Sequence, residues 1–184
     1  LNVEFKFSGD AVSLSQTAYI ERLVSTYLPD GPPLAGKHCS TPCDDALPRE
    51  VAEALTQDAA SIDPALLRQY QSLVGALLYC ATNTRPDVAF AVAYLCRAMA
   101  RPTPELLLDA QRVLCYLYST RHLGLRYQAT SAALYGMSDS DWAVKHSTSG
   151  HVFTYMSAAI SWGSKKQKTV ALSSCEAEIC LLYT

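Results

Sequence analysis

The sequence lacks long hydrophobic runs, a marked excess of charge of one sign and any sign of a secretory leader. Its apolar stretches, such as those around residues 73–81 and 88–96, are too short or too interrupted to span a bilayer. The first ten residues have neither the basic start nor the sustained apolar core of a signal peptide. We therefore expect no membrane segment and an intracellular protein of the cytoplasm or nucleus.

An even set of cysteines is also lacking. There are seven, which without a leader favours reduced thiols over a disulfide framework. His38, Cys39 and Cys43 lie close enough in sequence to suggest zinc, but a structural zinc site needs about four ligands and no second Cys/His pair lies at suitable spacing. We expect these residues to form a polar loop.

The balance of charge works against strong nonspecific binding of nucleic acid. Fifteen basic and seventeen acidic residues give a formal net charge of −2, whereas Lys and Arg supply most of the affinity for phosphate backbones. Lys165, Lys166 and Lys168 nevertheless form a local basic cluster. Either this cluster contacts nucleic acid or it is a solvated turn between two strands.

What the sequence does contain is enough apolar residue, 49% of 184, for one good core or two small ones. Apolar spacing predicts an α+β fold in four segments. A hairpin and a helix occupy residues 1–28, and a proline-rich linker with a short helix occupies 29–63. Residues 64–130 have helical periodicity, and residues 131–184 alternate as strands before a last helix.

The local signals refine these segments. Pro86 suits the first turn of a helix, where a missing N–H costs nothing, and helical patterning also begins at Pro64 and at Pro104. Strands are expected at 125–128, 133–138, 151–156 and 159–162, and a further extended piece at 169–172. Ser173 with Glu176 three residues later is a capping box, which predicts that a helix begins there.

Acidic residues occur at two places in the last segment, at the end of its first expected strand and at the start of its helix. Asp139 and Asp141 are two residues apart, so on a strand their side chains face the same way, and Glu176 lies in the first turn of the expected helix. Carboxylates are the ligands that hard divalent cations prefer. Taken alone, the aspartates could equally cap a turn, and Glu176 could simply complement the helix dipole.

Several motifs occur together and in order. The sequence resembles copia-type retrotransposon Pol polyproteins, in particular the end of the reverse transcriptase, the connection region and the N-terminal half of the ribonuclease H domain. The blocks that carry this resemblance are Val12–Leu23, Tyr70–Tyr79, Thr84–Ala89, Ser138–Ala143, Ser147–Gly150, Ala159–Gln167 and Ser173–Glu178.

The resemblance implies a helical connection region followed by a partial ribonuclease H-like mixed sheet with one helix. It implies that Asp139 and Glu176 hold Mg²⁺ beside the scissile phosphate of an RNA–DNA hybrid, with Asp141 and Glu178 tuning the site or facing solvent. Its partners would be a hybrid or other nucleic acid and the rest of the polyprotein, and no small-molecule substrate is implied.

The resembled activities need residues that this sequence does not contain. The family's nuclease uses two further aspartates, but no Asp follows Asp141, and no Tyr-x-Asp-Asp motif of a polymerase is present. We therefore expect that the 184 residues alone do not catalyse the reaction. The alternative is a degenerate or domesticated remnant that binds nucleic acid or protein without catalysis.

Overall fold

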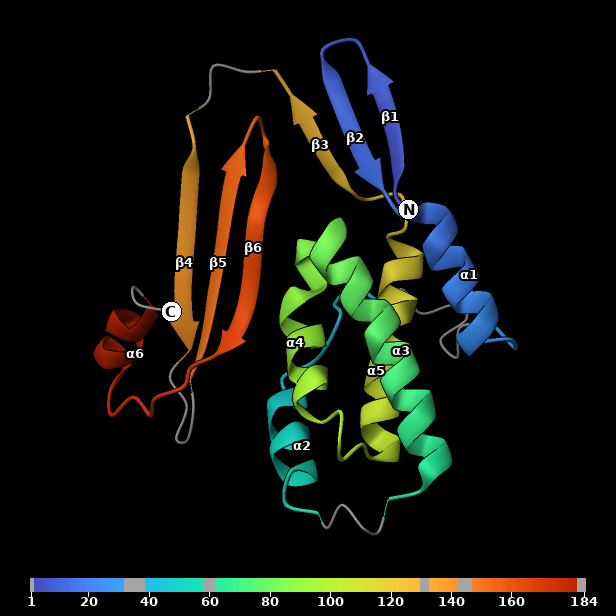
Figure 1. Ribbon diagram of the computed structural model, residues 1–184, viewed down its shortest axis with the longest axis vertical. Helices are drawn as coiled ribbons and strands as arrows, with labels where there is room; N and C mark the ends of the chain where they lie inside the picture. The colour runs from blue at the N-terminus through green and yellow to red at the C-terminus, as the bar shows by residue number, and fades with distance from the viewer. Residues whose placement is uncertain (1, 32–38, 58–61, 130–132, 142–146, 182–184) are drawn as a thin grey trace. The chain divides into compact units, whose positions relative to one another are not determined.

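The computed structural model describes residues 2–31, 39–57, 62–129, 133–141 and 147–181, and it is an α+β fold (Figure 1). Its contacts divide into two compact units. The first comprises residues 1–5 and 14–124, and the second comprises residues 6–13 and 125–184. No helix in the described ranges combines the length and the apolar character needed to cross a bilayer.

The first unit is a helical bundle preceded by part of a hairpin. The hairpin strands are β1 (Glu4–Ser8) and β2 (Ala11–Ser15). The helices are α1 (Thr17–Tyr27), α2 (Leu47–Ala54), α3 (Pro64–Asn83), the short 3-10 helix η2 (Pro86–Val88), α4 (Ala89–Arg97) and α5 (Pro104–Ser119).

Side-chain caps set where the two longest helices begin. The Asp63 carboxylate accepts hydrogen bonds from the backbone nitrogens of Ala65 and Leu66, at 3.0 and 3.4 Å. Thr103 accepts one from the Leu106 nitrogen at 3.2 Å at the start of α5. Each cap satisfies backbone donors that have no partner inside the helix, and a proline follows each cap as expected.

Helices α1, α2, α3, α4 and α5 share one hydrophobic core. It draws on residues of the first helix, the linker and the later helices alike, with Ile20, Leu47, Leu77, Leu95 and Leu114 all fully buried. Arg85 is buried beside this core, where its guanidinium donates to both carboxylate oxygens of Asp87 and to the carbonyl and hydroxyl of Thr120. Each guanidinium nitrogen thus has a hydrogen-bonding partner, which offsets the cost of burying the charge.

The second unit is built around the sheet β4–β5–β6, whose strands are β4 (Tyr135–Asp141), β5 (Thr148–Tyr155) and β6 (Ala158–Lys166). Both pairings are antiparallel, and a bulge lies between Phe153 and Thr154. The mixed sheet expected from the resemblance is therefore antiparallel throughout its described strands. β3 (Leu125–Gln128) pairs with the hairpin in a separate sheet, β1–β2–β3.

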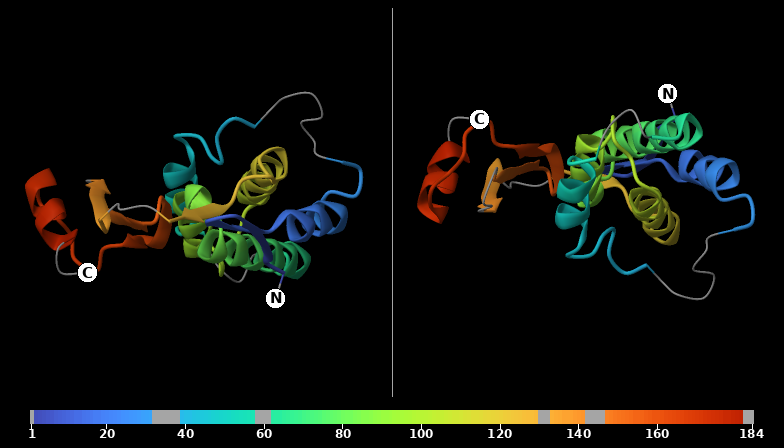
Figure 2. Two further views of the ribbon diagram at one scale, coloured as in Figure 1. Left: turned by 90° about the horizontal axis from the view of Figure 1, so that it is seen from above. Right: turned by 90° about the horizontal axis from the view of Figure 1, so that it is seen from below.

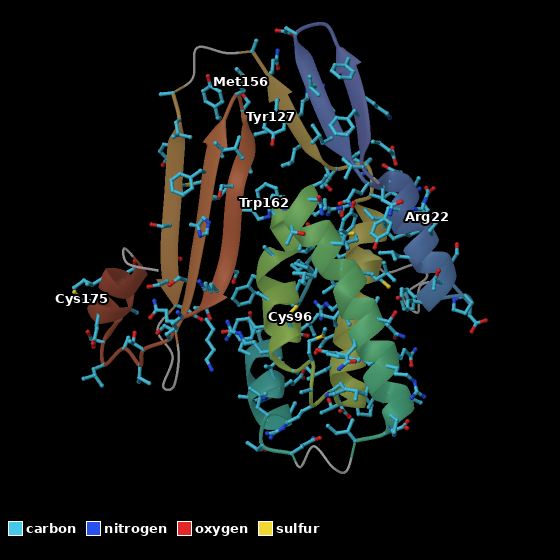
Figure 3. The ribbon with its side chains drawn as sticks, viewed as in Figure 1. Arg22, Cys96, Tyr127, Met156, Trp162 and Cys175 are labelled. Atoms are coloured by element: carbon cyan, nitrogen blue, oxygen red, sulfur yellow. The ribbon has the colours of Figure 1, made fainter. Side chains whose placement is uncertain are left out.

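The turn between β5 and β6 is anchored by β3. The Gln128 nitrogen donates to the Met156 carbonyl at 2.9 Å, and the Tyr127 hydroxyl donates to the Ala159 carbonyl at 2.6 Å (Figure 3). At the other end of the unit, α6 (Ser174–Leu181) lies beside β4, which is the outer strand of its sheet (Figure 2).

Candidate functional site

The acidic strand expected from the sequence is β4, and it carries Asp139 and Asp141 in its last three residues. Both aspartates are exposed. Gly150 of β5 lies opposite Asp139, so the neighbouring strand places no side chain beside that carboxylate. The Asp141 carboxylate, in contrast, accepts a hydrogen bond from the Thr148 backbone nitrogen. Of the two, Asp139 is the better placed to bind a ligand from solvent.

Glu176 is engaged at the start of α6. The Ser173 hydroxyl accepts from the Glu176 nitrogen at 3.1 Å, which confirms the half of the predicted capping box that depends on the serine. The Glu176 carboxylate reaches back and accepts from the Leu172 nitrogen at 2.7 Å. This hydrogen bond satisfies a backbone donor that precedes the helix, so the carboxylate has a structural task.

Glu178, to which the resemblance gives a secondary role, is an acidic side chain of α6 that contacts β4. Its carboxylate accepts from the Ser140 backbone nitrogen at 3.2 Å, between the two aspartates of β4. Residues two apart on a helix point about 200° apart, so Glu176 and Glu178 cannot both face β4. The buried Ala177 between them, with no exposed surface, lies on the side of the helix that packs inward.

The cross-strand rows show which face of the sheet α6 meets. Ser140, Ser149 and Lys165 form one row, and Asp141, Thr148 and Lys166 form the next, on the opposite face. The Gln167 side chain donates hydrogen bonds to Ser149 and to Ala177 of α6, so the helix is connected to the face of the sheet that carries Ser140 and Ser149. Asp139 alternates to the other face. That Asp139 and Glu176 share an ion remains a prediction.

The lysine cluster lies at the same end of the sheet as the aspartates. Lys165 and Lys166 are the last two residues of β6, so they are not a turn between strands, and both are exposed, as is Lys168. The register places Lys166 in the row of Asp141. A basic strand end and an acidic strand end thus flank β5.

The donor atoms at this sheet end suit magnesium in kind, because they are carboxylate oxygens open to solvent. Among the residues that the structure describes, no three His, Cys, Asp or Glu side chains gather into a group able to hold a metal ion. The region suggested for zinc is different in nature. His38 lies outside the described residues. The described part is a loop with exposed polar residues such as Thr41 and Asp44, but Cys39 is buried in the helical core with Cys43 packed against it.

Comparison with known proteins places the chain among transposon sequences. Over 184 aligned residues it is 34% identical to the putative transposon Ty5-1 protein YCL074W of Saccharomyces cerevisiae, covering 97% of the chain and 56% of that protein. It is also 34% identical over 174 residues to the retrovirus-related Pol polyprotein from transposon TNT 1-94 of Nicotiana tabacum, covering 90% of the chain and 12% of the polyprotein.

A third relative is shorter. The chain is 46% identical over 118 residues to the secreted RxLR effector protein 161 of Plasmopara viticola, which covers 61% of the chain and 83% of the effector. No protein-family model and no solved structure matches. The chain therefore spans only part of the transposon proteins, and it belongs to the family of copia-type retrotransposon Pol polyproteins.

Proposed function

We propose that the chain is a segment of a Pol polyprotein whose parent synthesises DNA from RNA and hydrolyses the RNA strand of RNA–DNA hybrids with a divalent metal. The second unit contributes to the hydrolysis. The observation that carries this proposal is the approach of the Glu178 carboxylate to the backbone of β4 at Ser140, one residue from the exposed Asp139. The Glu178 carboxylate of α6 thereby reaches the backbone at the end of the outer strand β4, next to Asp139, whose side chain alternates to the other face of the sheet.

Asp139 and Glu178 are the side chains that would hold Mg²⁺ in this proposal. Glu176, the sequence-based candidate, is less well placed because its hydrogen bond holds it at Leu172, before the helix, whereas that of Glu178 holds it at Ser140 of β4. When bound, the ion would supply positive charge that stabilises the charge developing on the scissile phosphate. The remaining ligands of the octahedral shell would come from water, phosphate and other parts of the polyprotein.

The lysines would hold the nucleic acid. Lys165 and Lys166 stand at the end of β6, two strands away from the aspartates, and exposed ammonium groups attract phosphates of either strand of a hybrid. Such contacts position the backbone without reading its sequence. The proposed partners are therefore an RNA–DNA hybrid and the rest of the polyprotein.

The test is cleavage of a labelled RNA–DNA hybrid by a Pol polyprotein that contains these residues. Asp139→Asn should reduce cleavage at least a hundredfold, because it removes a negative ligand while keeping its shape. Asp30→Asn, at an exposed aspartate of the helical unit, is the matched control and should leave cleavage unchanged. Full cleavage by Asp139→Asn would contradict the proposal.

A second candidate function is binding without catalysis. It is favoured by the similarity to a protein named an effector, because that match covers most of the effector's own length. Under this alternative, a protein that contains these residues would not cleave the hybrid, with or without Asp139→Asn, but it would still bind nucleic acid or a protein partner.

A further inference from the structure

Gln167 follows the last residue of β6, and its buried side chain connects the sheet to α6. The residue is 1% exposed. Its side-chain nitrogen donates to the Ser149 hydroxyl of β5 and to the Ala177 carbonyl of α6, each at 2.9 Å. Its backbone nitrogen donates to the Ser147 carbonyl at 2.8 Å. One buried amide thus connects the middle strand of the sheet to the acidic helix.

The second bond is placed next to the proposed metal ligand. Ala177 immediately precedes Glu178, whose carboxylate accepts from the Ser140 nitrogen of β4. A helix as short as α6, eight residues, is not stable in water by itself, so its position depends on tertiary contacts. The hydrogen bond from Gln167 therefore holds the backbone of α6 at the residue next to Glu178.

The geometry of the amide is determined by the two bonds it donates. Among the described residues its side-chain oxygen has no hydrogen-bonding partner, although it is buried. Both amide hydrogens are used, and one points to the sheet and the other to the helix. A side chain held in this way fixes the distance between Ser149 of β5 and Ala177 of α6.

We propose that Gln167 is a positioning residue that sets the distance between the acidic helix α6 and the acidic strand β4. This inference rests on the proposed function, because it concerns the placement of Glu178 relative to Asp139. In this role Gln167 is not itself a ligand of the metal or the substrate. It acts through Ala177, so its loss should shift Glu178 without removing any ligand.

The test uses two variants of the whole chain. Gln167→Met keeps the length and volume of the side chain but donates no hydrogen bond. Gln71→Met is the matched control, because the Gln71 side chain donates one bond of the same length, 2.9 Å, to the Met99 carbonyl in the helical unit. If Gln167→Met does not fold, Ser149→Ala, which removes the acceptor of only one of the two bonds, takes its place.

The first measurement is amide hydrogen exchange at Ser140, which reports the bond to Glu178. Exchange should become roughly tenfold faster in Gln167→Met, since two hydrogen bonds are lost, and about threefold faster in Ser149→Ala. Gln71→Met should leave it unchanged. Unchanged exchange at Ser140 in the folded Gln167 variant, or in Ser149→Ala if that variant has to be used, would overturn the inference.

The second measurement separates positioning from simple support of the fold. Mn²⁺ broadens amide signals near its binding site, and the concentration that half-broadens the Asp139 signal should rise several-fold in Gln167→Met at a temperature where the variant is fully folded. Equal midpoints would overturn the positioning role. If Mn²⁺ does not broaden the Asp139 signal even in the unaltered chain, the proposed metal site fails, whereas the exchange result still decides whether Gln167 places α6.

Discussion

The carboxylate of Glu178 lies 3.2 Å from the backbone nitrogen of Ser140, so an acidic side chain of α6 reaches β4 between its two aspartates. Glu176, two residues earlier, instead accepts from the Leu172 nitrogen. The two glutamates of one short helix therefore have different tasks. One completes the start of the helix, and the other meets the strand that carries Asp139.

This division of tasks predicts different effects of removing each carboxylate. Glu178→Ala should accelerate amide exchange at Ser140 several-fold, because its direct acceptor is lost. Glu176→Ala should cost α6 about 0.5 to 1 kcal/mol through the lost cap and should accelerate exchange mainly at Leu172. Nuclear magnetic resonance on the two purified variants checks both expectations. A larger effect on Ser140 from Glu176→Ala would reverse the assignment of roles.

The lysine cluster predicts a salt-dependent affinity for hybrids. Replacing Lys165, Lys166 and Lys168 together by alanine should weaken binding and reduce the slope of log affinity against log salt by about 2, if two to three phosphate contacts are lost. Fluorescence anisotropy with a labelled hybrid across a range of salt concentrations measures the slope.

The control for the lysine variant removes the same charge elsewhere. Lys6, Arg49 and Arg68 are exposed and lie outside the lysine cluster, so alanine at all three should change the slope little. Equal loss of slope in both triple variants would mean that overall charge, not the end of β6, determines binding.

A carboxyl pair in the helical unit makes stability depend on pH. Burial, a hydrogen bond with Glu50 and the negative charges of Glu50 and Asp44 raise the pKa of Asp109 to about 7, although the Arg112 guanidinium acts in the opposite direction. The folded state thus holds a proton that the unfolded chain releases near pH 4. Stability from this group is present below that value and is lost as the pH rises through about 7.

The corresponding variant is Asp109→Asn, which cannot ionise. It should raise the free energy of unfolding at pH 8 by about 1 to 2 kcal/mol, a value smaller than full linkage because solvent screens this half-buried pair. It should also flatten the fall in stability between pH 4 and 8. Urea unfolding of both proteins at several pH values measures this, and parallel pH profiles would contradict the assignment to Asp109.

Much of the fold could be predicted because its signals are local. Leu125–Gln128 is the strand expected from alternation, and Asp63 and Ser173 begin helices because their side chains accept from nearby backbone nitrogens. The extended piece expected at residues 169–172 does not form a strand. Val170 and Leu172 are exposed, so burial does not stabilise an extended conformation there.

The features that could not be predicted depend on contacts between distant residues. Cys39 is buried because the helical core covers it, which no spacing within residues 38–43 indicates. The tie from Gln167 to Ala177 depends on how α6 meets the sheet. For Glu178 the sequence did contain a signal. Side chains two residues apart on a helix point to nearly opposite sides, so if Glu176 caps the helix, Glu178 lies on the other side of it.

The most direct test of the account is a Mn²⁺ titration of the purified chain, followed through the backbone amide signals of β4. We predict that the amides of Asp139 and Ser140 broaden first, and that Asp139→Asn and Glu178→Ala each abolish this selectivity while Asp30→Asn does not. Broadening that begins elsewhere in the chain, or that is the same in Asp139→Asn, would contradict a metal site at the acidic end of β4.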